Sequence, residues 1–417
     1  MQITKNHAIY LWLTFLTCAC LCYLRAPDLF YDPRIWAEGG SVYIPQALEE
    51  GFLRNLFSTK LGYYSLFNNV SYSVITLFDL KYAAFLSAAL SFLAIMTTVS
   101  LALWLPMQGI ETTKQKMLLA ISIVIFSSAE IWLNVINVQF YLALCAFFVL
   151  MNDPIKTNAR LKWMSRSILV LALLTGPVSC FLCPVFAYRA YTERDKESYI
   201  LCAIMITLTL SQALIITGQF NESIGSRDIA FRRDFLSRWL KYNFLVPFTG
   251  DLKHSAKLLY NILGYGTFLY LTYTFIVART NRNTLIILSS FLFLSTLSHL
   301  FSLKMSGAPR YGYAPSLVLV YFLVRQLPQS RRWPQFILAA SLTANILYFP
   351  MHIYENSYST KWKKWGPALQ EFRNNETNNI TLWPSQWNIP AESHKHFLLL
   401  IESTNPHKTV EQSNEIH

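Results

Sequence analysis

Charged side chains gather between residues 25 and 62, directly after the first apolar segment of the chain. They are Arg25, Asp28, Asp32, Arg34, Glu38, Glu49, Glu50, Arg54 and Lys60. A carboxylate at an apolar boundary loses solvation, which raises its pKa and improves it as a general base. The acids of this loop are therefore candidates for proton abstraction. The alternative is that Arg34 pairs with Asp32 or Glu38 in ordinary ion pairs, each worth about 0–1 kcal/mol.

A second candidate site precedes a late apolar segment, where Arg310 follows a short stretch that begins at Lys304. A charge that enters a membrane-spanning segment is costly and usually has a partner or a function. The guanidinium fork matches a phosphate group, so Arg310 could hold one, with Lys304 as a further point charge. Arg34 could reach the same phosphate from the first loop. The alternative is that Arg310 only extends its charge to the membrane interface.

A third basic group lies in the stretch 217–255. Its members are Arg227, Arg232, Arg233, Arg238 and Lys241. Such a cluster favours an anionic ligand such as a lipid phosphate. The same residues also fit the polar face of a solvated amphipathic helix.

Apolar segments must position these residues. Of the 417 residues, 53% are hydrophobic and 14% are charged, whereas soluble domains carry roughly 25% charged residues. Runs of roughly 17–25 residues with almost no charge match the length of a membrane-spanning helix, and inside lipid only a helix satisfies such a backbone. The sequence therefore predicts an all-α, polytopic bundle. The predicted spans are 8–24, 63–79, 82–106, 116–134, 137–152, 166–188, 198–216, 256–276, 284–302, 312–325 and 335–352.

Two of these segments carry features that oppose a full crossing. The segment 63–79 contains Asn68 and Asn69, and it could lie at the interface or dip partway into the membrane. The segment 166–188 contains Thr175-Gly176-Pro177, which breaks a helix and makes a re-entrant hairpin an alternative. Nine full spans remain if both segments are partial, and there are eleven if both cross.

Lysine and arginine in short loops predict which ends face the cytoplasm. The loops with this bias contain Lys156, Arg160, Lys162 and Arg166; Arg189, Arg194 and Lys196; Arg279 and Arg282; and Arg325, Arg331 and Arg332. Either odd number of spans places the N-terminus in the cytoplasm and the C-terminus outside. The expected organisation is a transmembrane domain, 1–352, with outside loops 25–62 and 217–255. An extracytoplasmic segment, 353–417, then ends in a mobile tail.

The formal net charge of +12 does not indicate nucleic-acid binding, because the basic residues sit in short loops between apolar runs. The seven cysteines fall within or beside apolar segments. Cys180 and Cys183 form a CxxC pair without a second pair of ligands, so no zinc site is predicted. No metal or other cofactor is assigned from the sequence.

Several stretches resemble one family of membrane enzymes. Asp32–Tyr43 has the sequence DPRIWAEGGSVY, and Leu61–Leu66 has the sequence LGYYSL. These runs resemble the first outside loop of bacterial membrane glycosyltransferases of the GT-C superfamily. Asn137–Leu142, Thr175–Pro177 and Arg310-Tyr311 fit the same resemblance, which covers most of the chain. It implies a GT-C-like helix bundle in a bacterial inner membrane.

The resemblance also implies a reaction. GT-C enzymes transfer a sugar from a polyprenyl-phosphate carrier to a glycan or lipid acceptor on the outer face of the membrane. An acid of the first outside loop acts as the base, which falls here on Glu38, with Asp32 second. The residues expected to bind the substrate or its phosphate are Arg34, Arg310, Lys304 and Tyr63. Gly39 stands where a second acid is common, and a divalent ion, which some members need, is not assigned.

Two other functions remain open. A glycan polymerase of the O-antigen type also combines many spans with arginines that face outward. A transporter or flippase would place ionisable residues at mid-membrane and show repeated halves. The predicted spans contain few charges and no repeated halves, which favours chemistry at the outer rim over a pathway through the bundle.

Overall fold

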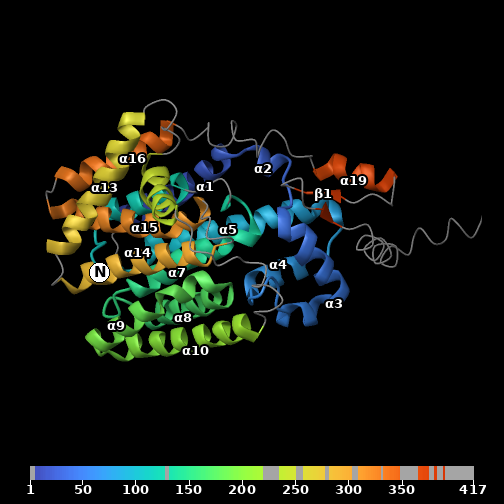
Figure 1. Cartoon of the computed structure of the whole chain (residues 1–417), viewed down its shortest axis with the longest axis horizontal. Coiled ribbons are helices and arrows are strands. Elements are labelled where there is room, and N and C mark those ends of the chain that lie inside the picture. Colours follow the sequence, from blue (N-terminus) through green and yellow to red (C-terminus); the bar gives the residue numbers. More distant parts are fainter. Residues whose placement is uncertain are drawn as a thin grey trace, which may run out of the picture.

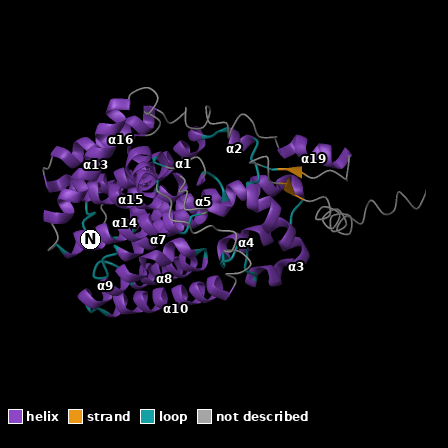
Figure 2. Ribbon diagram, in the orientation of Figure 1, coloured by secondary structure: helices purple, strands orange, loops and turns teal. Residues whose placement is uncertain are grey.

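The structure of the chain is a computed structural model, which describes residues 5–126, 131–218, 234–249, 257–277, 281–302, 309–329, 332–347, 365–374, 380–382 and 388–389. Helices make up nearly all the secondary structure of these residues, and the exception among them is a two-stranded hairpin (Figure 2). The predicted all-α class is therefore confirmed for the described part of the chain.

A bundle of helices forms most of the molecule (Figure 1). Its helices are α1 (Lys5–Arg25), α5 (Ala83–Trp104), α6 (Thr113–Ile125), α7 (Val138–Leu150), α8 (Ala159–Leu174), α9 (Cys183–Glu193), α10 (Lys196–Gly218), α13 (Lys257–Val277), α14 (Arg282–Leu300), α15 (Pro309–Gln326) and α16 (Arg332–Leu347). α7 packs against α5, α8 and α15, and all its side chains except Gln139 are buried. A helix that is apolar on every side belongs in the interior, so α7 is the centre of the bundle.

Four helical segments among the described residues are long and apolar enough to cross a membrane. They are His7–Arg25, Leu80–Trp104, Lys196–Gly218 and Arg282–Leu300. Large apolar side chains of α1 and α10 are exposed on the outside of the bundle, among them Trp12, Leu16, Leu210 and Leu214. Extensive exposed apolar surface suits contact with lipid and not with water.

The predicted span 63–79 is helical only over Leu66–Ile75, which forms α4. At 1.5 Å per residue these ten residues cover about 15 Å, half of a hydrocarbon core about 30 Å thick. The helix is therefore too short to cross a membrane by itself, in line with the partial alternative.

The predicted span 166–188 is a hairpin and not a single helix. α8 ends at Leu174, and after Thr175 and Gly176 the short helix η5 (Pro177–Leu182) leads into α9. Gly176 has a φ of 116°, which residues with a side chain rarely adopt, and Pro177 cannot continue α8. α8 and α9 both pack against α10, and Figure 1 shows the three helices along one side of the bundle.

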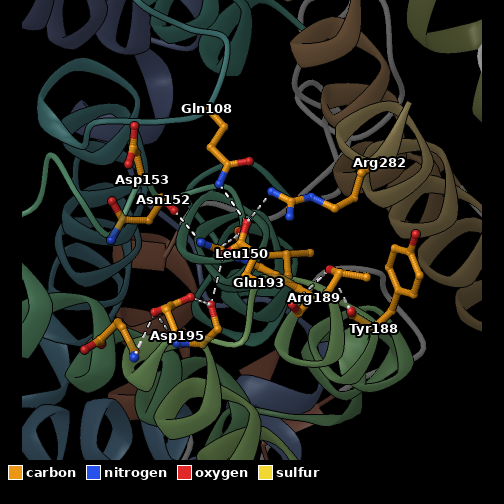
Figure 3. Close-up of polar contacts among 12 residues, drawn as sticks. Gln108, Leu150, Asn152, Asp153, Tyr188, Arg189, Glu193, Asp195 and Arg282 are labelled. Carbon is orange, nitrogen blue, oxygen red and sulfur yellow. Dashed lines mark hydrogen bonds and ion pairs between the residues drawn. The ribbon is translucent and has the colours of Figure 1, made fainter. Parts of the chain in front are cut away.

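Residues from several connections of the bundle contact one another at one end of it, and Figure 3 draws these polar contacts. Glu193 accepts hydrogen bonds from Arg189 Nε at 2.8 Å, Gln108 Nε2 at 2.9 Å and Arg282 Nη2 at 3.2 Å. Arg189 also donates to the carbonyl oxygen of Asn152 at 2.7 Å, just after α7 ends. The connections after α5, α7 and α9 therefore lie beside the start of α14.

The end of α15 lies at the same end of the bundle. Tyr321 Oη donates to the carbonyl oxygen of Gln108 at 2.7 Å, and Gly109 lies against the Arg325 side chain. The short helix η9 (Leu327–Gln329) follows α15. The described parts of the four predicted basic loops are thus on one side of the bundle. We name this side the basic end; Arg279 and Arg331 lie outside the described residues.

The first predicted outside loop lies at the opposite end, together with the described part of the C-terminal segment (Figure 1). The elements at this end are α2 (Asp28–Tyr31), η1 (Gly39–Tyr43), α3 (Ile44–Phe57), α4, η2 (Leu80–Tyr82), η4 (Val135–Asn137), α19 (Trp365–Asn374), β1 (Ile380–Thr381) and β2 (Asn388–Ile389). β1 and β2 pair antiparallel, with Ile380 opposite Ile389. These elements bury a second hydrophobic core that includes Ile35, Tyr72 and Trp365.

The stretch from Gly39 to Phe57 is helical but broken. It consists of η1 and α3, with a kink at Gly51, whose φ is 73°. Before the kink Ile44 is buried against the second core, whereas after it Leu53 and Phe57 are exposed. The second half of α3 therefore presents an apolar surface to the surroundings.

The structure describes two parts of the second predicted outside loop, 217–255. They are 217–218, the last residues of α10, and 234–249. There α11 (Phe235–Leu240), η7 (Lys241–Leu245) and α12 (Val246–Thr249) form a continuous helical segment against α13, α15 and α16. Arg238 pairs with Asp234 at 2.5 Å, one turn earlier. Arg227, Arg232 and Arg233 lie outside the described residues, so the anionic-ligand hypothesis for the full cluster stays a prediction.

Candidate functional site

Glu38 lies on a strained stretch of backbone between α2 and η1. The preceding residue, Ala37, has a φ of 24°, outside the regions that residues with a side chain favour. Such strain is held only where surrounding packing fixes the chain, and it is found often at functional sites. The Glu38 side chain is half-buried, and with the described residues it forms neither a hydrogen bond nor an ion pair. The predicted ion pair between Glu38 and Arg34 is therefore absent.

Gly39 is required by the close approach of Tyr72. A Cβ atom at position 39 would lie 2.1 Å from Tyr72 Oη, and Tyr72 is fully buried. A second acid, which is common at this position in the family that the sequence resembles, would not fit here. Burial raises the pKa of Tyr72, and the charge of Glu38 raises it further. The carboxylate of Glu38 thus lies near a hydroxyl group that stays protonated.

Gly40 allows the C-terminal segment to cover the same stretch. A Cβ atom at Gly40 would lie 2.4 Å from Leu382 Cδ1 and 3.1 Å from Ile389 Cγ1. The backbone beside Glu38 is consequently packed between α4 on one side and the end of the β1–β2 hairpin on the other.

Three tyrosines, which we call the tyrosine cluster, link this backbone to the bundle: Tyr43, Tyr63 and Tyr72. The rings of Tyr43 and Tyr72 stack with centroids 5.3 Å apart. The Tyr43 hydroxyl is hydrogen-bonded to Tyr63 and accepts from Asn68 Nδ2 at 3.4 Å. Burial raises the pKa of Tyr43, so its hydroxyl also remains protonated.

Lys60 is a buried cation beside the tyrosine cluster. Its Nζ donates to Asn55 Oδ1, lies 3.4 Å from Asn69 Oδ1 and stands 5.0 Å from the centre of the Tyr43 ring. Burial lowers the pKa of Lys60 to about 8, and the carboxylate of Glu50 acts in the opposite direction. A tight turn leads from Lys60 to Tyr63, whose backbones exchange two hydrogen bonds of 3.2 Å.

Three stretches that the GT-C resemblance singled out meet at this place. Tyr63 and Gln139 both face Gly176, where a Cβ atom would lie 2.5 Å from Gln139 Oε1 and 3.5 Å from the Tyr63 ring. Ser65 pairs with Thr175 through the backbone. The turn of the α8–α9 hairpin therefore contacts both the first loop and the start of α7.

Buried acceptors without a partner surround the tyrosine cluster. Among the described residues, the side-chain oxygens in this condition at this end of the bundle include Glu50 Oε2, Ser65 Oγ, Asn68 Oδ1 and Gln139 Oε1. Buried polar groups are normally hydrogen-bonded, and each exception calls for an explanation such as a water molecule or a ligand. A ligand rich in hydroxyl groups would satisfy several of them at once.

The other predicted site residues take different positions. Asp32 directly follows α2, and Arg34 stands over the Trp36 ring at 5.0 Å. Arg310 stands over the Tyr311 ring at 5.1 Å, and Tyr311 contacts Phe140, the residue after Gln139, with centroids 5.5 Å apart. Lys304 lies outside the described residues.

Arg310 thus lies near the start of α7, with Tyr311, Phe140 and Gln139 between it and Tyr63 of the tyrosine cluster. None of these contacts joins Arg310 to Glu38 directly. The structure brings together Glu38 and Tyr63 through Tyr72 and Tyr43 instead.

Sequence reasoning did not single out Lys60, Tyr72 or Gln139 as site residues. Lys60 is one of nine charges in the loop, Tyr72 lies in the segment 63–79, whose depth in the membrane the sequence leaves open, and Gln139 belongs to a stretch that resembles GT-C enzymes. One available signal is that Gln139 is the residue of α7 with the most polar side chain, within a run of otherwise aliphatic, aromatic and cysteine residues. In the described residues no group of three or more His, Cys, Asp and Glu side chains could hold a metal ion.

A comparison with models of known protein families found no match, and no curated protein matches the chain at a significant level. The geometry around Glu38 and the tyrosine cluster is therefore what indicates a function.

Proposed function

We propose that the chain is a membrane glycosyltransferase that moves a sugar from a polyprenyl-phosphate carrier to a hydroxyl group of a glycan or lipid acceptor. Glu38 is the general base, and the tyrosine cluster is the polar floor of the site. The observation that carries the proposal is the half-buried carboxylate of Glu38, which has no hydrogen bond or ion pair with the described residues. A base must keep its lone pairs available for the acceptor proton.

The surroundings of Glu38 suit a hydroxylic substrate. The unpartnered oxygens of Asn68 and Gln139 can accept hydrogen bonds from sugar hydroxyls, and the protonated Tyr72 can donate one. The exposed apolar side chains of Leu53 and Phe57 on α3 suit the adjacent lipid, where a prenyl chain resides.

The arrangement of the bundle supports a site on the outer face. We infer that the basic end faces the cytoplasm and that the first loop faces outside, because basic residues concentrate in cytoplasmic loops. On this orientation the longer of the remaining helices, α13, α15 and α16, also cross the membrane, which raises the number of spans from four toward the nine to eleven predicted. Arg25, one of the buried charges of the bundle, lies against the carbonyl oxygens of Val124 and Ile125 at the end of α6. Helix-end contacts of this kind account for a buried cation without a transport pathway.

The test is Glu38→Gln, which keeps the shape of the side chain and removes its basicity. General-base catalysis contributes about 10²–10⁴ to rates, so we expect transfer from a labelled polyprenyl-phosphate sugar to fall by that factor. Glu49→Gln, which changes an exposed carboxylate of the same loop, should transfer at the wild-type rate. Full activity of Glu38→Gln would exclude Glu38 as the base.

The surface glycan of a strain that lacks the protein separates a transferase from a polymerase. A missing side sugar favours a transferase, and single repeat units favour a polymerase.

A further inference from the structure

A buried histidine near the end of α14 has one ring nitrogen without a partner. His299 is 1% exposed, and its Nδ1 lies 2.8 Å from the carbonyl oxygen of Ser295. A carbonyl oxygen can only accept, so Nδ1 carries the proton, and in the neutral ring Nε2 has the free lone pair. Nε2 is buried and has no hydrogen-bond partner within the described residues. Because Nδ1 faces the backbone of its own helix, Nε2 points away from α14.

Two tyrosines border this imidazole. The Tyr242 ring lies 6.2 Å from the His299 ring with 28° between their planes, and the Tyr311 ring lies at 6.2 Å with 56°. A positively charged side chain lies over each tyrosine ring. Lys241 Nζ is 5.1 Å from the Tyr242 ring, and the Arg310 guanidinium is 5.1 Å from the Tyr311 ring. Side chains from η7, α14 and α15, which are separate in the sequence, thus converge on one unpartnered acceptor.

His299, Tyr242 and Tyr311 lie toward the end of the bundle that holds the tyrosine cluster. α14 begins at the basic end with Arg282 and reaches His299 in its last turn. Tyr311 also contacts Phe140, and the neighbouring Gln139 belongs to the surroundings of Tyr63. Side chains of α7 therefore connect the two places.

We propose that His299, Tyr242 and Tyr311 form a sugar-binding site, in which a sugar hydroxyl donates a hydrogen bond to His299 Nε2. Aromatic walls with a small number of polar groups are the usual lining of a small-molecule site, and an aromatic ring offers the apolar face of a sugar a flat contact surface. Nε2 is closed to solvent and has no donor among the described residues, so the side chains around it must move apart to admit the hydroxyl group that supplies one. The flanking cations favour a sugar that stands next to a negative group. This site adds a sugar-binding role to the proposed function. It depends on the proposed function only for the source of the sugar.

The proposal is tested with protein labelled with ¹⁵N-histidine in a detergent that carries no sugar head group. The His299 resonances are identified among the eight histidines by their loss in His299→Gln. Separate probes are methyl glucoside, methyl galactoside, N-acetylglucosamine, glucose 1-phosphate and inorganic phosphate. We expect at least one sugar to shift the Nε2 resonance and to raise the unfolding temperature, whereas phosphate alone should do neither. A larger effect of glucose 1-phosphate than of methyl glucoside assigns the site to the donor sugar, and the reverse assigns it to the acceptor.

The matched variants separate binding from folding and from catalysis. His299→Phe keeps a ring without an acceptor and should lose the stabilisation by sugar, while His299→Gln keeps an acceptor and should retain part of it. Glu38→Gln should show the wild-type shift, so a failure of Glu38 as the base leaves this result unchanged. The proposal is overturned if no sugar shifts the resonance, if phosphate alone reproduces the shift, or if folded His299→Phe is stabilised as much as the wild type.

Discussion

The ammonium group of Lys60 lies 5.0 Å from the centre of the Tyr43 ring, within the end of the bundle that the first loop forms. Both side chains are buried, and Lys60 is 4% exposed. The amide oxygens of Asn55 and Asn69 and the face of the tyrosine together replace the water that the cation loses. This contact ties the end of α3 to α4 and thereby fixes the tyrosine cluster beside Glu38.

The burial of Lys60 should make stability depend on pH. Its pKa is about 8 in the folded protein against 10.5 for an unperturbed lysine, so between these values the unfolded chain binds more protons. Stability then rises with pH from about 8 to about 10.5, by up to about 3 kcal/mol from this group. Lys60→Met should be less stable at pH 7, because two amide oxygens lose their donor, and it should lack this rise.

The measurement is chemical unfolding in detergent at a series of pH values. Lys81→Met is the control, because Lys81 is an exposed lysine at the start of the helical segment that leads into α5. Its pH profile should match the wild type. A profile of Lys60→Met that rises as steeply as the wild type would show that Lys60 does not cause the effect.

The contact between Gly39 and Tyr72 predicts a steric effect of one methyl group. In Gly39→Ala the new Cβ meets the buried Tyr72 hydroxyl, and overpacking of this kind costs about 1–3 kcal/mol. Gly266→Ala, in the interior of α13 with no atom near the new Cβ, should instead gain about 0.5–1 kcal/mol. Adding Tyr72→Phe to Gly39→Ala removes the closest atom and should restore part of the loss. Equal effects at the two glycines in unfolding experiments would contradict this account.

The long helices were predictable from local sequence. α5, α10 and α14 begin and end within a few residues of the predicted spans 82–106, 198–216 and 284–302. Each is an apolar run bounded by polar or charged residues or, at the end of α5, by Pro106, so the same local signal gives both its type and its length. Breaks were visible where a residue forbids a helix, as Pro177 does after α8.

The depth of α4 and the partners of its polar residues were not predictable in this way. The side chain of Asn69 is buried because it contacts Lys60 and the backbone oxygen of Ser58. The turn after Lys60 reverses the chain and places α4 next to these two residues. Such contacts depend on three-dimensional packing and leave no periodic pattern in the sequence. For the same reason the loop around Glu38 could be identified from its charges and motif, whereas its neighbour Tyr72 could not.

Glu193 should be important for stability at the basic end. Its carboxylate is the partner of the buried Arg189 and also binds Gln108 and Arg282. Removing one partner of a buried ion pair costs about 3–5 kcal/mol, because the other charge stays buried without compensation. We therefore expect Glu193→Gln to lower the free energy of unfolding by about that amount.

The matched control for this variant is Glu111→Gln. Glu111 pairs with Lys156 at 3.1 Å, and both side chains are largely exposed. Exposed pairs contribute about 0–1 kcal/mol, so this variant should unfold close to the wild type in the same denaturant series. Similar losses in the two variants would mean that burial does not set the strength of the Glu193 interactions.

Trp365 should hold the C-terminal segment over the strained backbone beside Glu38. Its side chain is buried in the second core, and its Nε1 donates to the carbonyl oxygen of Leu80 at 3.0 Å, just before α5. Trp365→Ala should cost about 3–5 kcal/mol through the lost packing and hydrogen bond. Trp333→Ala, which removes a tryptophan of α16 that is 68% exposed, should change the stability by no more than about 0.5 kcal/mol.

Because Leu382 and Ile389 cover Gly40, the loss of Trp365 should also speed hydrogen exchange of the amides from 37 to 43 more than that of α7. Unchanged exchange of residues 37–43 in a destabilised Trp365→Ala would show that the C-terminal segment does not restrain the loop of Glu38.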